Sequence, residues 1–184
     1  MKKYSFFFIL FTSVAFFSCK KEGYKAPASN TVAMAGRWWY ELIKDANSDG
    51  IFNEDDGDEL LVSYADYGAP DLITTNTNAN DKDSVLITDQ FSPAFGQWPF
   101  KVHVPVDVAS LTFTPASGLL NKALSDGETV SVIEGKILKN AATTLSGGRS
   151  DSIFLRLEFS DGDEGTQYIF SGLRDTGFPE DQYE

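Results

Sequence analysis

The sequence predicts an all-β protein whose folded part is an antiparallel up-and-down β-barrel of about eight strands. Apolar residues recur at every second position in several segments, most clearly in 101–108 and 153–160, and this period of two is typical of strands buried on one face. Short segments rich in Gly, Asp, Asn and Pro separate the strands, and such connections favour antiparallel neighbours. Closing the sheet into a barrel removes exposed strand edges. A two-sheet β-sandwich is the alternative.

The first residues have the features of an export signal. Lys2 and Lys3 precede an apolar run, residues 4–17, which only three Ser or Thr residues interrupt. This run is too short to span a bilayer comfortably, and the two lysines hold its start in the cytoplasm. The sole cysteine, Cys19, can form no internal disulfide. We therefore expect residues 1–18 to be a lipoprotein signal peptide that is cut before Cys19, and Cys19 to carry the lipid; a plain secretory signal is the alternative.

The chain is acidic beyond this segment. Residues 19–184 hold 13 basic and 27 acidic side chains, a formal net charge of −14. This charge argues against nucleic acid as a partner. It also argues against a surface that lies on anionic lipid, so membrane contact would come from the acyl chains. The Ser-Cys-Lys-Lys-Glu sequence at 18–22 resembles lipoproteins of Bacteroidetes, and we expect a lipid-anchored protein of the cell envelope, in the outer membrane, on either its periplasmic or its surface side.

Two regions follow the signal. Residues 19–34 are polar, contain Gly23 and Pro27 and lack a sustained apolar period, so we expect a flexible tether. The barrel domain is expected to cover residues 35–184. The expected strands are 36–44, 59–67, 72–77, 84–88, 101–108, 111–114, 128–138, 153–160 and 166–174. The residues expected to face the barrel interior are Val102, Val104, Ile153, Leu155, Leu157 and Phe159.

Two positions within this domain need separate treatment. Leu119–Leu124 could form one or two helical turns. Pro105 falls in an alternating segment but cannot donate a hydrogen bond to a strand ladder, so we expect it at a bulge or strand end.

Residues 45–56 match the spacing of calcium-binding loops. The template requires oxygen ligands at alternate positions from one to nine, Gly at six and an acid at twelve. Gly50 is at position six, and Asp56 is at twelve, where dockerin-type loops, which this segment resembles, also use Asp. We expect a weak structural calcium site in a hairpin between two strands; a solvated acidic turn is the alternative. The expected ligands are Asp45, Asn47, Asp49, Ile51, Asn53 and Asp56.

The Gly36-Arg37-Trp38 sequence opens the first strand of the domain. A Gly-x-Trp motif at this point resembles the lipocalins and the wider calycin superfamily, in which the tryptophan plugs the closed end of the barrel. The resemblance implies that Arg174 in the last strand lies across the Trp38 indole, where a guanidinium contributes about 0.5–2 kcal/mol. The alternative is that Trp38 is ordinary core and Arg174 ordinary surface.

Four segments together resemble a Bacteroidetes lipoprotein family, the lipid-binding putative hydrolases. These segments are 35–39, 73–77, 151–153 and 171–181. The resemblance covers nearly the whole domain, and it implies a calycin-like barrel with an apolar or lipid-like ligand. It provides no catalytic residues that could be transferred to this chain.

The sequence supplies no recognisable catalytic set. A nucleophile and base pair normally needs His, or a low-pKa Cys or Lys, near a Ser, Thr or Cys. The one histidine, His103, falls on the polar face of its strand, Cys19 is the expected lipidation site, and no Gly-x-Ser-x-Gly motif occurs. We therefore assign no catalytic residues, and a hydrolase built on paired carboxylates stays an alternative function.

Residues 90–100 combine aromatic rings with two prolines and a glycine. This segment could be a lid over the barrel mouth, a carbohydrate-stacking surface or core packing. A lid favours binding of a small apolar or lipid-like molecule in the barrel, which is the function we expect. A stacking surface favours the alternative, a glycan-binding or protein-assembly module with a filled barrel. The candidate rings at the ligand mouth are Phe91, Phe95, Trp98 and Phe100.

Overall fold

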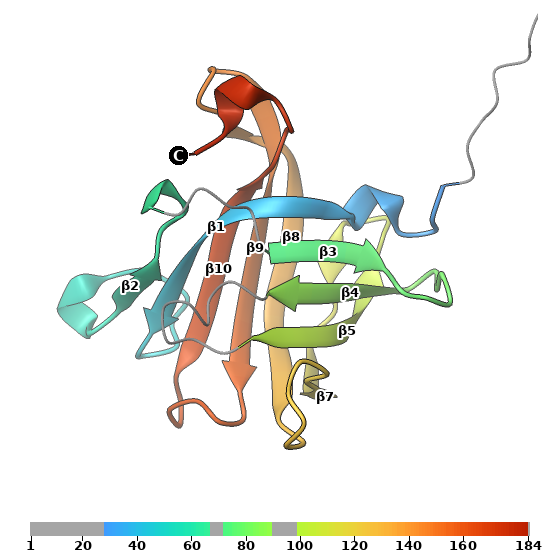
Figure 1. Ribbon diagram of the computed structural model, residues 1–184. Helices are drawn as coiled ribbons and strands as arrows, with labels where there is room; N and C mark the ends of the chain where they lie inside the picture. Colours follow the sequence, from blue (N-terminus) through green and yellow to red (C-terminus); the bar gives the residue numbers. More distant parts are fainter. Residues whose placement is uncertain (1–27, 67–71, 90–98, 184) are drawn as a thin grey trace, which may run out of the picture.

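The computed structural model describes residues 28–66, 72–89 and 99–183, which form a strongly twisted sheet (Figure 1). The strands are β1 (Gly36–Asp45), β2 (Glu59–Val62), β3 (Leu72–Asn76), β4 (Ser84–Asp89), β5 (Phe100–Asp107), β6 (Thr112–Phe113), β7 (Ala116–Leu120), β8 (Thr129–Thr143), β9 (Arg149–Phe159) and β10 (Gln167–Arg174). Short 3-10 helices are η1 (Val32–Met34), η2 (Glu54–Asp56), η3 (Tyr64–Asp66) and η5 (Pro179–Asp181). Among these residues no helix has the length and apolar character needed to cross a membrane.

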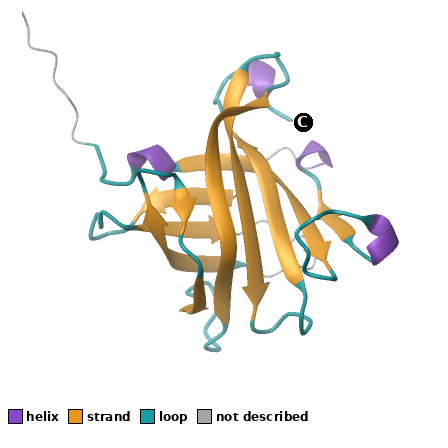
Figure 2. Cartoon of the chain, turned by 180° about the vertical axis from the view of Figure 1, so that it is seen from behind, coloured by secondary structure: helices purple, strands orange, loops and turns teal. Residues whose placement is uncertain are grey.

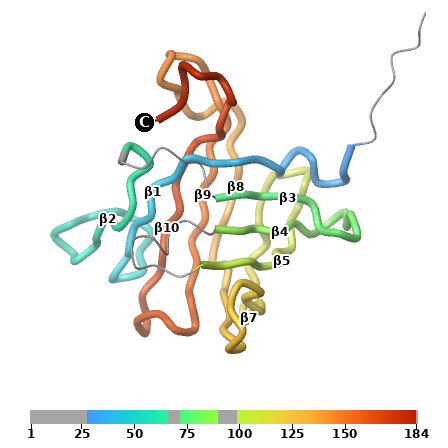
Figure 3. Tube along the Cα trace, in the orientation of Figure 1, coloured from blue at the N-terminus to red at the C-terminus, as the bar shows by residue number. Residues whose placement is uncertain are grey.

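Eight of the strands form a closed barrel wall. Their order is β1-β3-β4-β5-β6-β8-β9-β10, and β10 pairs with β1 to close the circle, with every pairing antiparallel. β2 pairs with the second half of β1, and β7 pairs with β8. In the tube of Figure 3, β3, β4 and β5 run across the front while β8, β9 and β10 run steeply behind them, as the strand tilt of a small barrel requires. The predicted barrel is confirmed, and the two-sheet sandwich is excluded.

Side chains alternate between the inside and the outside of the wall. The six residues predicted to face the interior all lie in the hydrophobic core, and none is more than 9% exposed; they are Val102, Val104, Ile153, Leu155, Leu157 and Phe159. The period of two therefore located the core correctly on both segments that show it most clearly.

Residues just before position 35 contact the barrel. Met34 in η1 is fully buried, and its carbonyl accepts a hydrogen bond from the Thr74 hydroxyl at 2.6 Å. Thr31 is also fully buried. Asn30 donates two hydrogen bonds to Asn80, from its backbone N–H to Oδ1 at 3.0 Å and from Nδ2 to the backbone carbonyl at 2.6 Å. Asn30, Thr31 and Met34, which fall in the segment expected as a tether, thus pack against the strands.

Two local expectations are corrected by the structure. Leu119–Leu124 forms no helical turn, because residues 119–120 end β7 and pair with residues 129–130 of β8. Pro105 lies within β5 and not at a bulge or strand end. Its carbonyl accepts the Thr114 N–H at 2.8 Å, so its missing N–H faces the edge where β6 supplies only two paired residues.

A smaller apolar layer lies on the outer face of β1. Trp39 is 1% exposed, and its ring lies 5.1 Å from that of Tyr183, which in turn lies 4.7 Å from Tyr64. Burial raises the pKa of Tyr183 to about 12. The Asp181 carboxylate accepts the Ser146 N–H at 3.0 Å, which ties η5 to the β8–β9 hairpin, as Figure 2 shows from behind. The C-terminal segment therefore packs against the outside of the wall.

Gly172 in β10 permits the close approach of β1. A Cβ at this position would lie 2.0 Å from the carbonyl oxygen of Trp39, so Gly172→Ala must push the two strands apart. We expect this variant to lose at least about 1–3 kcal/mol of unfolding free energy, measured by urea denaturation. Gly148→Ala, in the exposed β8–β9 hairpin, would meet only the hydroxyl oxygens of Thr144 and Ser146 and should change stability little. If both variants lost the same unfolding free energy, the close approach of β1 and β10 at Gly172 would not be a special constraint.

Candidate functional site

Five aromatic side chains form a layer across the inside of the barrel. They come from β1, β5, β9 and β10, and they are Tyr40, Phe100, Phe159, Tyr168 and Phe170. Neighbouring ring centroids lie 5.4–5.6 Å apart, mostly edge to face, which is the favoured arrangement of aromatic pairs. Each residue is at most 9% exposed. These rings therefore form one continuous aromatic layer in the core.

A buried polar pair adjoins the aromatic layer. Asp89, the last residue of β4, is fully buried, and its Oδ2 accepts a hydrogen bond from the Tyr40 hydroxyl at 2.9 Å. A carboxyl group inside an apolar barrel costs free energy unless hydrogen bonds offset its desolvation. The sequence analysis did not select Asp89. The alternation of its strand could have identified it, because Asp89 falls on the same inward face as Val85 and Ile87.

Trp38 and Arg174 lie together at another part of the wall. The guanidinium carbon of Arg174 is 4.9 Å from the centroid of the Trp38 ring, as the calycin resemblance implies. The indole Nε1 donates a hydrogen bond to Thr74 Oγ1 at 3.0 Å, and Asp151 lies 3.4 Å from the guanidinium Nε. A Cβ on Gly36 would lie 3.1 Å from the indole. These contacts, together with the buried Met34 of η1, fill this part of the barrel.

The predicted aromatic mouth is only partly within the described residues. Phe91, Phe95 and Trp98 lie outside them. Phe100 is the first residue of β5, fully buried, and belongs to the aromatic layer. Its ring packs against Phe159 and Phe170.

The loop between β1 and β2 follows the predicted calcium template in sequence, and it is held by its own side chains. Asp45 Oδ2 accepts the Gly50 N–H, and Asp49 Oδ1 accepts the Ile51 N–H, both at 2.8 Å. Asn53 Nδ2 donates to Asp56 at 2.6 Å. The further predicted ligand, Asn47, is exposed and donates to Asp49 at 3.3 Å.

A second acid, which the sequence analysis did not select, closes the same loop. Asp58 is 6% exposed, and its two carboxylate oxygens accept the N–H groups of Ala46 and Asn53, each at 2.9 Å. Across the part of the chain that the structure describes, no three His, Cys, Asp or Glu side chains converge as a metal centre. A cation in this loop would therefore need amide, carbonyl or water oxygens as further ligands.

His103 lies on the exposed outer face of β5, opposite Leu86 of β4. Partial burial and the charges of Lys122 and Lys101 lower its pKa. Within the described ranges, no hydrogen bond joins His103 to a hydroxyl or carboxylate group, so a nucleophile and base pair is not assembled at this position.

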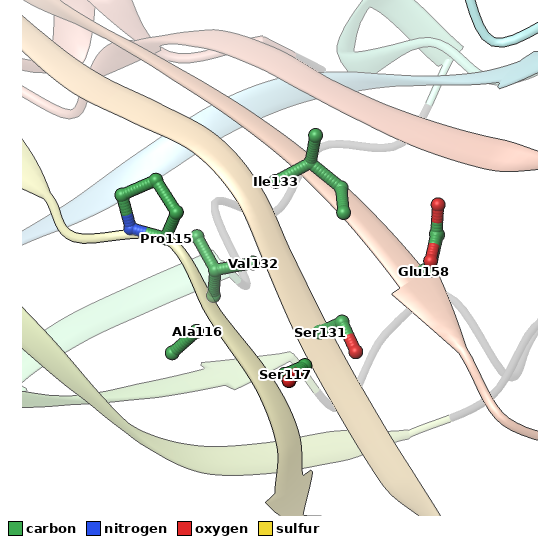
Figure 4. A pocket seen from close by; sticks show the side chains of 7 residues that line it. All are labelled: Pro115, Ala116, Ser117, Ser131, Val132, Ile133 and Glu158. Carbon is green, nitrogen blue, oxygen red and sulfur yellow. The ribbon is translucent and has the colours of Figure 1, made fainter.

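Two shallow hollows interrupt the outer surface, one where β7 meets β8 and one where β6 meets β8. They measure about 440 and 460 Å³ and share Pro115. Register shifts occur near them in the β7–β8 pairing, between Ala116 and Leu119, and in the β8–β9 pairing, between Val132 and Glu134. Figure 4 shows the first hollow, in which Ser117, Ser131 and Glu158 supply the polar atoms. Its lining contains no aromatic ring, so it lacks the flat apolar face on which sugars commonly stack.

Comparisons with known proteins identify one family. The family model described as "Lipid-binding putative hydrolase" matches residues 23–179. A crystal structure from Bacteroides ovatus, described as of unknown function, is similar at 14% sequence identity with a TM-score of 0.47. That match covers 77% of this chain and 42% of the other, so this chain spans less than half of that protein's length. No curated protein matches the sequence.

The Tyr40–Asp89 contact can be tested as a pair. Tyr40→Phe removes a hydrogen-bond donor from a buried carboxyl group, and we expect it to lower the unfolding free energy by about 1–3 kcal/mol. In a double-mutant cycle with Asp89→Asn, urea denaturation should show a coupling of about 0.5–3 kcal/mol. Tyr64→Phe, outside the barrel, is the matched control and should not couple to Asp89→Asn. Strict additivity of Tyr40→Phe and Asp89→Asn would show that the contact contributes nothing to stability.

Proposed function

Because the chain belongs to the family of lipid-binding putative hydrolases, we propose that its barrel binds a small apolar or lipid-like molecule against the aromatic layer. The observation that carries this proposal is the buried Tyr40–Asp89 pair beside that layer. Apolar rings supply the contact area, at roughly 25 cal/mol per Å² removed from water. A few polar groups in an otherwise apolar site orient the ligand and give specificity.

The polar pair also limits which head group the ligand can carry. The Tyr40 hydroxyl donates a hydrogen bond to Asp89, so the pair holds a carboxyl group beside the aromatic layer. In this proposal Asp89 is ionised, and its charge repels a fatty-acid carboxylate but tolerates a hydroxyl or an ammonium group. This chemistry favours neutral or cationic lipids over free fatty acids.

Displacement of an environment-sensitive fluorescent lipid probe tests this preference. A long-chain alcohol should bind about tenfold or more tightly than the fatty acid of equal chain length, a difference of about 1.4 kcal/mol. Asp89→Asn should reduce this ratio because the amide replaces a charge with a donor. Asp126→Asn, on the exposed turn between β7 and β8, is the control and should leave the ratio unchanged. If neither compound displaces the probe, the proposed site is wrong.

Native mass spectrometry of protein purified from its host addresses the ligand itself. We expect a co-purifying species whose mass fits a neutral or cationic lipid-like molecule. A protein that carries no ligand and binds immobilised glycans would instead favour the glycan-binding module.

We further propose that the protein is anchored to the outer membrane by lipid on Cys19. The support is the sequence alone: two lysines, an apolar run, and Ser18 before the sole cysteine. Cys19 lies outside the described residues. The first described residue, Ala28, is close enough in sequence to Cys19 that the anchor would hold the barrel near the bilayer.

Cys19→Ala tests the anchor. In the host, the wild-type protein should partition into the detergent phase of a Triton X-114 extraction, and its N-terminal peptide should carry the mass of acyl chains. The variant should move to the aqueous phase or keep its uncut N-terminus. An unmodified Cys19, or a mature N-terminus elsewhere, would contradict the proposal.

A further inference from the structure

Asp45 presents a buried oxygen atom without a donor. The residue is fully buried at the end of β1. Its Oδ2 accepts the Gly50 N–H from the loop, whereas Oδ1 has no hydrogen-bond partner. A buried charged oxygen in this state is destabilising unless a donor or a cation reaches it.

The neighbouring strand presents a second oxygen of the same kind. Gln167 of β10 is the cross-strand partner of Asp45 and is 9% exposed. Its amide nitrogen donates to Glu158 at 2.8 Å, which identifies the other atom as the oxygen because only the NH₂ group can donate. That oxygen, Oε1, is buried and has no partner. Two unpartnered acceptors thus occupy adjacent positions on the outer face of the barrel, beneath the β1–β2 loop.

We propose that these two oxygens are the fixed part of a calcium site, which the β1–β2 loop completes. Calcium takes about six to eight hard oxygen ligands, including carboxylates, amide carbonyls and water. Asp45 Oδ1 supplies a carboxylate oxygen, and Gln167 Oε1 supplies an amide carbonyl oxygen. Asn47 and Asp49, exposed in the loop above them, supply further oxygens at the spacing of the calcium template. Gln167 is a ligand that the linear motif cannot include, because it lies on a different strand.

Acidic side chains lie around this position. Their negative charge favours a cation over a water molecule as the partner of the two oxygens. The β1–β2 loop carries Asp49 and Asp56, and the adjoining β9–β10 hairpin carries Asp161, Asp163 and Glu164. The hairpin and the loop are in direct contact, since the Ser48 hydroxyl donates to the Gly165 carbonyl at 2.5 Å. Lys44 neutralises Asp163 at 2.6 Å, but it does not reach Asp45. A calcium ion would offset the buried charge and join the loop to the wall.

Arg156 is the competing cation. Its Nη1 would lie 2.5 Å from a Cβ on Gly50, so the guanidinium covers the loop from the β9 side. It pairs with Glu134 at 3.8 Å, and its Nε is buried without a partner. Its charge should weaken the calcium site, and we expect dissociation constants in the range of extracellular modules, ~10⁻⁴ to 10⁻³ M.

Calcium titration of the full chain, followed by calorimetry and by thermal melting, tests the proposal. Calcium at about 100 times its dissociation constant should raise the Tm by roughly 5–10 °C, as expected for a ligand that binds only the folded state. Magnesium should give a much smaller shift, because it gives up its water ligands reluctantly. Asp45→Asn keeps an acceptor for the Gly50 N–H but removes the charge, and it should abolish most of the shift. Gln167→Leu should weaken calcium binding several-fold.

Two controls separate a built site from general attraction to acids. Asp55→Asn removes the same charge from an exposed position of the same loop and should keep the full calcium response. Arg156→Gln should strengthen calcium binding. The proposal is overturned if the wild type shows neither binding heat nor a Tm shift, or if Asp55→Asn reduces the response as much as Asp45→Asn. It is also overturned if Arg156→Gln lowers the Tm of a calcium-insensitive protein, because Arg156 would then be the counter-ion of Asp45.

Discussion

The antiparallel pairing of β10 with β1 is the interaction on which the rest of the structure depends. Its eight residue pairs run from Trp38 with Arg174 to Asp45 with Gln167 and join the two ends of the strand order. Their pairing leaves neither strand as an unpaired edge of the wall. Successive side chains of each strand then point alternately into the barrel and out of it. The approach is so close at Gly172 that a β-carbon would collide with the backbone of the partner strand. The seam is therefore both the closure of the barrel and its least tolerant position.

Alternation along β1 gives this one strand two different roles. Tyr40 points inward and joins the aromatic layer and Asp89. Asp45 points outward and lies beside Gln167, beneath the acidic loop. Among the described residues the interior is mainly apolar, with the buried Tyr40–Asp89 contact at its aromatic layer, whereas the outer face at the end of the strand gathers negative charge. A ligand inside and a cation outside would thus act on the same seam without sharing a residue.

Local patterns predicted a large part of the fold. The alternation in 101–108 and 153–160 placed Val104 and Leu155 in the core correctly, because the period of two is a property of the strand itself. The Gly36-Arg37-Trp38 motif likewise pointed to the contact with Arg174. Asp89 and Gln167 were missed for a common reason. Each is a polar residue at a strand end, where a solvent-exposed side chain is the ordinary expectation, and each is buried through pairing with other strands.

The sequence by itself determined the all-β class, the strand periods, the acidic charge and the family of the protein, because these depend on residues within a few positions of one another. Only the tertiary structure decided which oxygens lack donors and which rings meet. It placed Phe100 in the core, although its aromatic segment left a surface role open, and it turned Leu119–Leu124 from a possible helix into strand and turn. Burial and partnership are set by strand pairing across the closed wall, and at the β1–β10 seam that pairing joins residues more than a hundred positions apart.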